Sequence, residues 1–258
     1  MAKTAEVHYA DLLGPVYTWM VGDVDAAFAR GDSELGTLAL PSMQGATAVD
    51  LGAGFGLHAI PLARRGFSVL ALDSCEVLLK DLRQRAGLLP IRIVNANLLD
   101  FKAHMAAPAD VILCMGDTLT HLPDHSSVER LFKDAAASLR PDGFLVATFR
   151  DYVSGELKDE ARFIPVRSDA ERILTCFLEY KDTTVTVHDL LYQLEGGSWR
   201  LHAGSYPKLR LAPLWVVERL SSLGLAVVRD AGPGGMTRIV ARKAPASRAG
   251  ATKMKAGA

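Results

Sequence analysis

Between residues 46 and 149, short apolar runs alternate with segments whose apolar positions recur every three or four residues. Short continuous apolar runs bounded by glycine or polar residues are typical of buried strands, and the longer period is typical of amphipathic helices. The alternation predicts a parallel sheet with helices on both faces. The predicted strands span 46–51, 67–72, 91–94, 111–115 and 144–149, and the predicted helices span 58–65, 76–85 and 126–139.

The helix predicted over 126–139 has the clearest pattern. Ser126 and Glu129 have the spacing of a capping box, which predicts that this helix begins at Ser126. A turn over 140–143 follows it. The apolar positions with helical spacing are Val128, Leu131, Phe132, Ala135, Ala136 and Leu139.

After Arg150 the apolar period changes from helical spacing to alternation, which indicates antiparallel strands over 172–180, 183–194 and 199–205. A helix over 212–223 and two closing strands, 225–229 and 237–241, complete the pattern. The predicted fold class is therefore α/β: a doubly wound, mostly parallel seven-stranded sheet with a small antiparallel β cap inserted after the fifth strand.

This pattern divides the chain into five parts. Residues 243–258 are small or basic, and we expect them to be disordered. The parts are a helical lead-in, broken at Gly14-Pro15 (1–45), an α/β core (46–152), an antiparallel cap (153–208), the C-terminal part of the core (209–242) and the tail (243–258).

Composition narrows the classes of protein. The 258 residues are 49% hydrophobic and 22% charged, which excludes a disordered or collagen-like chain. Basic and acidic residues both number 29, so there is no basic excess of the kind that nucleic-acid binders carry. No apolar run approaches the roughly 20 residues of a membrane helix. Three widely spaced cysteines favour reduced thiols and a cytoplasmic location.

A glycine-rich turn follows the first predicted strand. Glycines there let the backbone approach a ligand closely, and the next helix offers free amide donors. A dinucleotide motif would need a glycine at position 57, which is Leu57. The spacing D-x-G-x-G-x-G instead resembles the first motif of class I S-adenosylmethionine-dependent methyltransferases. The residues concerned are Asp50, Gly52, Ala53, Gly54 and Gly56.

The resemblance implies S-adenosylmethionine as cofactor, with S-adenosylhomocysteine as product, and a lead-in that covers the cofactor site. Asp73 ends the second strand and is expected to accept hydrogen bonds from the ribose hydroxyls; the alternative is a helix cap. Asn97 is expected to accept from the adenine amino group; the alternative is a polar turn residue. Further expected cofactor contacts are Ser74, Leu98, Met115 and Gly116.

Two loops resemble the glycine/sarcosine N-methyltransferase-like small-molecule group. One is the fourth strand with its loop, 109–122, and the other is Thr148-Phe149-Arg150-Asp151-Tyr152. The resemblance places the arginine that binds the substrate carboxylate at Arg150; the alternative is a surface ion pair. Tyr152 is expected either to donate a hydrogen bond to the acceptor or to pack.

Two residues after the fourth strand bear on the acceptor. Asp117 stands where the amino-acid enzymes carry Asn, so it would repel a carboxylate and fits a cationic amine better. His121 is a candidate base, because its unperturbed pKa of about 6.5 suits proton removal near neutrality; the alternative is a histidine that hydrogen-bonds loop backbone. His125 lies four residues later, but Pro123 intervenes and no third ligand is evident, so we predict no metal.

These patterns predict methyl transfer to a small molecule, with an amine nitrogen as acceptor atom. The alternatives are a small-molecule O-methyltransferase and a catalytically silent S-adenosylmethionine-binding protein. We expect no nucleic-acid or membrane partner, and we leave a homo-oligomer open. Cap residues that could line the acceptor pocket are His188, Tyr192, His202 and Tyr206; alternation alone does not decide which face of the cap looks inward.

Overall fold

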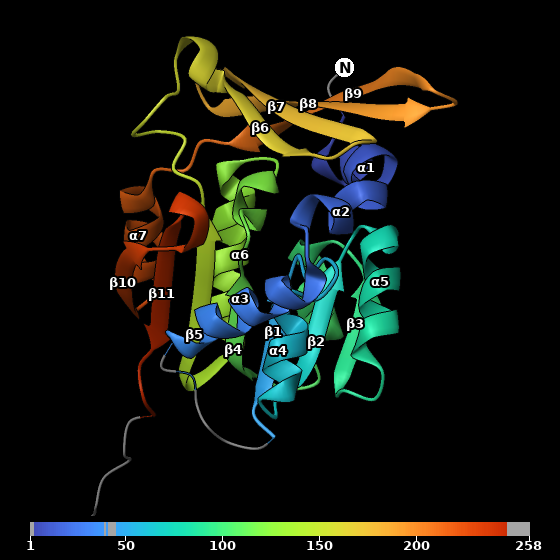
Figure 1. Ribbon diagram of the computed structural model, residues 1–258. Coiled ribbons are helices and arrows are strands. Elements are labelled where there is room, and N and C mark those ends of the chain that lie inside the picture. Colours follow the sequence, from blue (N-terminus) through green and yellow to red (C-terminus); the bar gives the residue numbers. More distant parts are fainter. Residues whose placement is uncertain (1–2, 39, 41–44, 247–258) are drawn as a thin grey trace, which may run out of the picture.

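The larger of two sheets forms the core of the protein. The computed structural model describes residues 3–38, 40 and 45–246. The strands of the larger sheet lie in the order β10-β11-β5-β4-β1-β2-β3 (Figure 1). Pairs from β5 to β3 are parallel, and β11 is antiparallel to both its neighbours. The strands of the larger sheet are β1 (Thr47–Leu51), β2 (Ser68–Asp73), β3 (Ile91–Asn95), β4 (Ala109–Cys114), β5 (Leu139–Phe149), β10 (Leu225–Ala231) and β11 (Thr237–Lys243).

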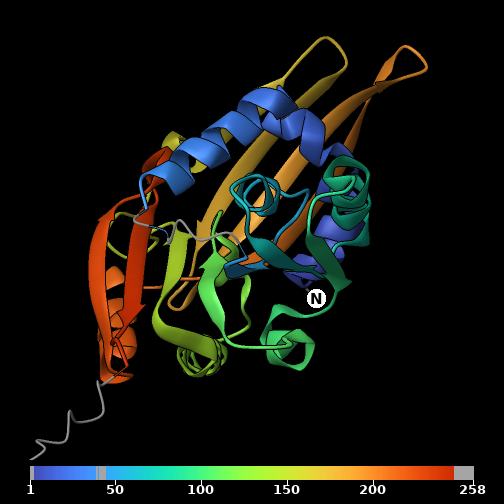
Figure 2. The same cartoon turned by 90° about the horizontal axis from the view of Figure 1, so that it is seen from below.

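Helices cover both faces of this sheet, as the alternating pattern predicts (Figure 2). Apolar side chains of α3, α4 and α5 pack on one face. Those of α6, α7 and the short helix η3 pack on the other. The helices are α3 (Val24–Gly36), α4 (Ala59–Arg64), α5 (Glu76–Ala86), α6 (His125–Ser138), α7 (Pro213–Ser222) and η3 (Leu98–His104). The predicted fold class is confirmed.

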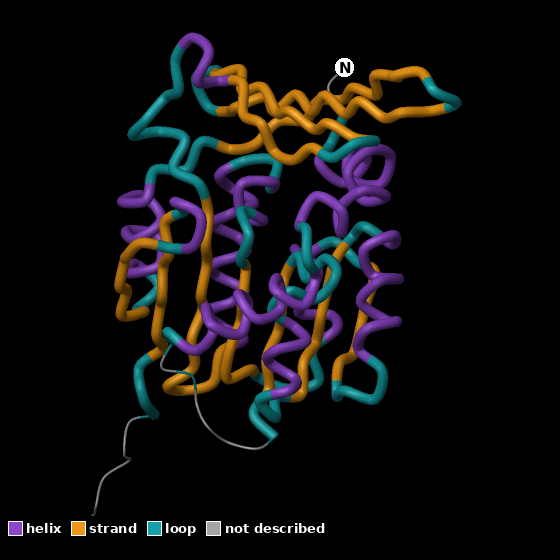
Figure 3. The backbone as a smooth tube through the Cα atoms, in the orientation of Figure 1, coloured by secondary structure: helices purple, strands orange, loops and turns teal. Residues whose placement is uncertain are grey.

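The cap is a separate antiparallel sheet in the order β6-β7-β8-β9. It lies across the end of the core at which β5 finishes (Figures 1 and 3). The short helix η5 (Asp159–Arg162) precedes it. Its strands are β6 (Phe163–Ser168), β7 (Arg172–Tyr180), β8 (Thr184–Glu195) and β9 (Ser198–Leu209).

Two strands of the cap differ from the sequence-based expectation, and both contain proline. β6 was not predicted, and the strand predicted to end at Ser205 runs on to Leu209. Proline cannot donate to a ladder, so it suits edge strands, and Pro165 and Pro207 both lie on edge strands. The extension of β9 carries Lys208 over the core.

The lead-in is helical but does not break at Gly14-Pro15 as predicted. It runs through α1 (Ala5–His8), η1 (Tyr9–Leu13), η2 (Gly14–Val16) and α2 (Tyr17–Val21). The chain turns at Gly22, where φ is 95°, and Asp23 caps α3. Leu13 and Val16 pack against the inward face of the cap.

The lead-in is also tied to the cap by a buried polar contact. His8 Nε2 lies 2.7 Å from the Asp189 carboxylate of β8, and the His8 ring stacks on Tyr206 at 4.5 Å. Lead-in and cap therefore form one layer over the core.

The C-terminal strand extends two residues beyond the predicted strand and enters the predicted tail by one residue. Lys243 ends β11, and its ammonium group donates to the carbonyls of Ala136 and Leu139 at 2.8 and 2.7 Å. The rest of the predicted tail beyond residue 246 lies outside the described residues. None of the described helices is long and apolar enough to cross a membrane.

The N-terminus of α6 corrects the predicted capping box. Asp124 is the N-cap, and its carboxylate accepts from the Ser127 backbone N–H at 2.7 Å and from the Ser126 hydroxyl at 2.7 Å. An aspartate satisfies the free amides of the first turn as a serine would, so the helix begins one residue earlier than predicted.

Replacing Asp124 therefore tests the observed cap. Asp124→Ala is expected to lower the free energy of unfolding by about 1 kcal/mol, because a free amide of the first turn loses its partner. Glu129→Ala, which removes the acid of the predicted capping box, should change it by less than about 0.5 kcal/mol. Urea denaturation of the two variants decides, and a larger effect for Glu129 would contradict the assignment.

Candidate active site

The turn after β1 brings backbone to the carboxyl edge of the sheet. The amides of Gly52 and Ala53 both donate to the Leu72 carbonyl at 2.9 Å, which ties the turn to β2. Gly52 has φ of 75°, and a Cβ atom there would lie 2.4 Å from Thr118 Cγ2. Both the conformation and the space therefore require glycine at this position.

Asp73 lies next to this turn at the end of β2. Its carboxylate accepts from the backbone N–H groups of Gly54 and Cys75, each at 2.8 Å. Burial raises the pKa of Asp73, and the backbone hydrogen bonds oppose that rise. Each oxygen keeps a second lone pair, so the carboxylate can still accept from a ligand.

One cavity of about 450 Å³ joins the two candidate regions of the site. Cofactor residues predicted from the sequence line one part of it: Gly52, Ala53, Gly54, Asp73, Ser74, Asn97, Leu98, Met115 and Gly116. The lead-in contributes Thr4, Ala5, Glu6, Tyr9 and Tyr17 to the same wall.

Two predicted contact residues are not part of the cavity wall. Asp50 is 2% exposed beneath the turn, and burial raises its pKa to about 6. Gly56 has φ of 99°, and a Cβ atom there would lie 2.4 Å from Leu82 Cδ1. The structure thus corrects both from ligand contacts to residues that shape the turn and its packing.

Asn97 lies in the cavity wall as the N-cap of η3. Its Oδ1 accepts from the Leu99 backbone N–H at 2.9 Å. The turn role and the adenine role are therefore compatible, because the amide oxygen has a second lone pair.

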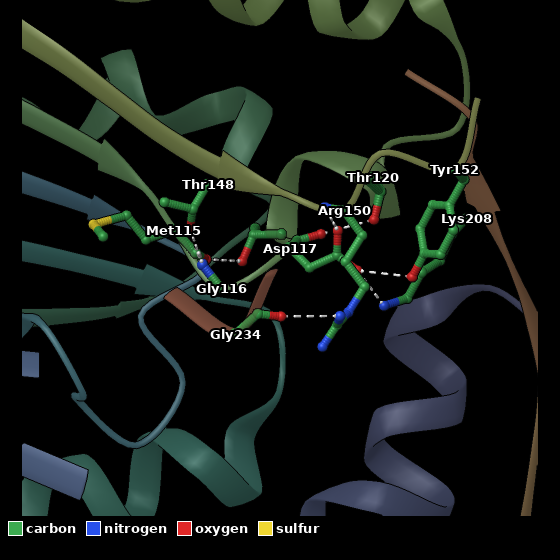
Figure 4. Close-up of polar contacts among 10 residues, drawn as sticks. Met115, Gly116, Asp117, Thr120, Thr148, Arg150, Tyr152, Lys208 and Gly234 are labelled. Atoms are coloured by element: carbon green, nitrogen blue, oxygen red, sulfur yellow. Dashed lines mark hydrogen bonds and ion pairs between the residues drawn. The ribbon is translucent and has the colours of Figure 1, made fainter. Parts of the chain in front are cut away.

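On the acceptor side, Asp117 is buried, and both of its carboxylate oxygens accept hydrogen bonds (Figure 4). One carboxylate oxygen accepts from the Arg150 backbone N–H at 2.9 Å. The other accepts from the Tyr152 hydroxyl at 3.2 Å and from the Lys208 ammonium at 2.6 Å. Burial alone would raise the pKa of Asp117, but Lys208 and these hydrogen bonds lower it, so Asp117 is ionised.

Lys208 changes the electrostatics predicted for the acceptor. It is 9% exposed and lines the cavity, whereas Asp117 lies behind it and does not. Burial opposes its charge, but Asp117 outweighs burial and raises the pKa of Lys208. The expectation that Asp117 would repel an acceptor carboxylate is therefore wrong, because a cation covers it.

The side chain of Arg150 lies outside the cavity. It is exposed, and its Nη1 donates to the Gly234 carbonyl at 3.3 Å (Figure 4). Only its backbone N–H contributes to the site, through Asp117. The structure therefore does not bring the Arg150 guanidinium together with the other candidate acceptor residues.

His121 is half-buried in the cavity wall between aromatic rings. Its ring lies 5.4 Å from that of Tyr9 and 5.6 Å from that of Tyr206. Burial, reinforced by the Lys208 charge, lowers its pKa to about 3. Within the described residues its Nε2 has no hydrogen-bond partner. His121 is thus a neutral acceptor of hydrogen bonds at pH 7, and a weaker base than its unperturbed pKa predicts.

The cap presents alternate residues of its strands to the site. Tyr206 and Lys208 of β9 share the inward face, which carries the buried cluster with Leu174 and Val187. His188 and Tyr192 lie on the opposite face, and His188 contacts Glu179 at 3.2 Å. Of the four predicted cap residues, Tyr206 is the one that packs beside the site, and Lys208 is the contact that the sequence analysis missed.

Comparison with known proteins identifies the core. Residues 48–143 match the family described as "Methyltransferase domain". The chain is 28% identical over 181 residues to a glycine N-methyltransferase of Rattus norvegicus, covering 64% of the chain and 62% of the relative. It is 31% identical over 167 residues to a ubiquinone biosynthesis O-methyltransferase of Xylella fastidiosa, covering 63% and 62%. The match thus spans less than two thirds of either relative.

Solved structures share the whole fold, cap included. The CcbJ methyltransferase of Streptomyces caelestis superposes with a TM-score of 0.74 at 22% identity, covering 93% of this chain and 99% of that one. DesVI of Streptomyces venezuelae gives a TM-score of 0.73 at 17% identity, covering 90% and 98%. Residues 48–143 thus match a methyltransferase domain, and the α/β core resembles those of class I S-adenosylmethionine-dependent methyltransferases.

The residues present fit S-adenosylmethionine as the cofactor of this domain. The turn at Gly52 leaves no room for a side chain, and Asp73 keeps free lone pairs beside it in the cavity wall. Among the described residues there is no group of three or more His, Cys, Asp or Glu side chains placed to hold a metal ion.

The lowered pKa of His121 predicts a pH-dependent stability. Between pH 6.5 and about 3 the unfolded chain binds a proton at His121 that the folded chain does not, so stability falls as pH falls. The His121→Phe variant lacks this proton site. When the pH is lowered from 7 to 5, its free energy of unfolding is therefore expected to rise by about 2 kcal/mol relative to that of the wild type. Urea denaturation at both pH values measures this difference, and an equal difference at pH 7 and pH 5 would refute it.

Proposed function

We propose that the protein transfers the methyl group of S-adenosylmethionine to a small-molecule acceptor, with an amine nitrogen as the acceptor atom. The observation that carries this proposal is the single cavity of about 450 Å³ that reaches from the turn at Gly52 to His121 and Lys208. A cofactor held at the turn and an acceptor beside His121 would therefore share one continuous space.

The chain's own residues suit cofactor binding at one end of this cavity. The Asp73 carboxylate binds the ribose hydroxyls, and the residues around Asn97 and Leu98 hold the adenine. Gly116 and Met115 follow β4 and border the acceptor region. When bound, the cofactor supplies an electrophilic methyl group on a sulfonium, and proximity can contribute about 7–11 kcal/mol to the transfer.

The acceptor end favours a neutral nucleophile. An amine must be uncharged to attack, and burial together with the Lys208 charge disfavours a protonated amine, as both do for His121. We propose that the neutral ring of His121, which lines the cavity, contacts the amine and leaves its lone pair free to attack the methyl group. The methylated nitrogen is then positively charged, and it loses its proton to solvent water, so His121 need not hold that proton.

Methylation of a hydroxyl oxygen is the second candidate. The Lys208 ammonium also acts to lower the pKa of the nearby Tyr9 hydroxyl, although burial outweighs it. An acceptor hydroxyl closer to Lys208 would ionise more readily for the same reason. The Xylella fastidiosa relative is named as an O-methyltransferase, which supports this candidate.

A labelled-methyl assay tests the proposed function. The protein is incubated with S-adenosylmethionine labelled in the methyl group and a small-molecule extract of the source cell, and the products are separated. A labelled product of low mass is expected, and its structure distinguishes nitrogen from oxygen. Failure of calorimetry to detect cofactor binding, together with no labelled product, would overturn the proposal.

Asp73 is the sharpest single test of the cofactor role. Asp73→Asn should weaken S-adenosylmethionine binding at least tenfold, because the loss of a charged hydrogen-bond acceptor costs about 1.5–3 kcal/mol. Asp182→Ala, an exposed acid in the turn between β7 and β8, is the matched control and should leave the Kd unchanged. Equal calorimetric affinity for wild type and Asp73→Asn would remove Asp73 from the cofactor site.

A further inference from the structure

The buried ammonium of Lys208 is only partly hydrogen-bonded. An ammonium carries three N–H donors. One of them donates to Asp117 at 2.6 Å, and no other acceptor within the described residues receives a hydrogen bond from it. Because Lys208 is 9% exposed and lines the cavity, its remaining donors need an oxygen or nitrogen acceptor that occupies the cavity.

The charges around Lys208 favour an anionic partner. Asp117 neutralises the lysine from behind but does not line the cavity, so a group in the cavity lies closer to the ammonium than to the carboxylate. Coulomb energy falls with distance, and the nearer positive charge therefore dominates. The acceptor end would attract a negative charge.

The acids that line the cavity lie away from Lys208, at the cofactor end. Among the described lining residues the acids are Glu6 and Asp73, and the charge of Glu6 acts on Asp73. His121, which shares the acceptor end with Lys208, is neutral at pH 7. Nothing in the described wall at that end competes with an anion for the ammonium.

We infer that Lys208 is the specificity residue of the acceptor site and that it binds an anionic oxygen group, such as a carboxylate, carried by the acceptor. This inference rests on the proposed function. It assigns to Lys208 the carboxylate-binding role that the resemblance placed at Arg150, because the Arg150 guanidinium lies outside the cavity. It also explains why an aspartate can stand at position 117: its charge holds the lysine in the anion-binding position.

Binding of matched neutral and anionic probes tests the inference. The chain is saturated with S-adenosylhomocysteine, and calorimetry measures the affinity of acetate against acetamide, benzoate against benzamide, and sarcosine against sarcosinamide. We expect at least one carboxylate to bind at least tenfold more tightly than its amide. The absence of such a preference in all three pairs would overturn the inference.

Three variants assign the preference to Lys208. Lys208→Met alone would leave Asp117 buried without its cation, so the test uses the double variant Asp117→Asn with Lys208→Met, which removes both charges. It should reduce the preference to less than twofold. Lys208→Arg should retain it, and so should Lys181→Met, an exposed lysine next to the same sheet.

The outcomes separate the inference from the proposed function. Loss of S-adenosylhomocysteine binding by the wild-type chain would count against the methyltransferase proposal itself. Intact binding of S-adenosylhomocysteine by the double variant, with an undiminished carboxylate preference, would show that another residue binds the anion and would overturn the role of Lys208.

Discussion

A carboxylate buried at the end of β4 imposes the arrangement of the site. Removing Asp117 and Lys208 from water costs several kcal/mol per ion, and that cost is offset only by close pairing and additional hydrogen bonds. Three groups supply these partners: the Arg150 backbone N–H and the Tyr152 hydroxyl, both in the segment after β5, and the ammonium of Lys208 on β9. The cap therefore has one favourable position over the core, and in that position it forms part of the cavity wall.

The two sheets contribute different chemistry to this shared space. The parallel core supplies backbone and short polar side chains at the carboxyl ends of its strands, where the turn at Gly52 and the acid at Asp73 lie side by side. The antiparallel cap and the lead-in supply long and aromatic side chains. Because the first set is fixed by strand ends and the second by side-chain length, substitutions on the cap can change the proposed acceptor end without altering the proposed cofactor end.

The sequence allowed the core and most residues of the cavity wall next to the Gly52 turn to be predicted, because strand periodicity and glycine spacing are local properties. It did not allow Lys208 to be found. Pro207 interrupts the strand pattern, so the continuation of β9 was not predicted, and the partner Asp117 lies 91 residues earlier. Asp50 and Gly56 show the opposite limit. Their motif positions were recognised, but spacing does not distinguish a residue that contacts a ligand from one that lies beneath the turn.

The pairing of Asp117 with Lys208 also has a consequence for folding. The cap is inserted between β5 and α7, so a chain could in principle assemble the core first and add the cap later. A core without its cap would leave the Asp117 carboxylate without its cation, and a cap detached from the core would leave the Lys208 ammonium beside Tyr206 without its anion. Partial opening at this boundary therefore costs free energy in both parts. The two sheets thus behave as one cooperative unit, although their hydrogen-bond ladders are separate.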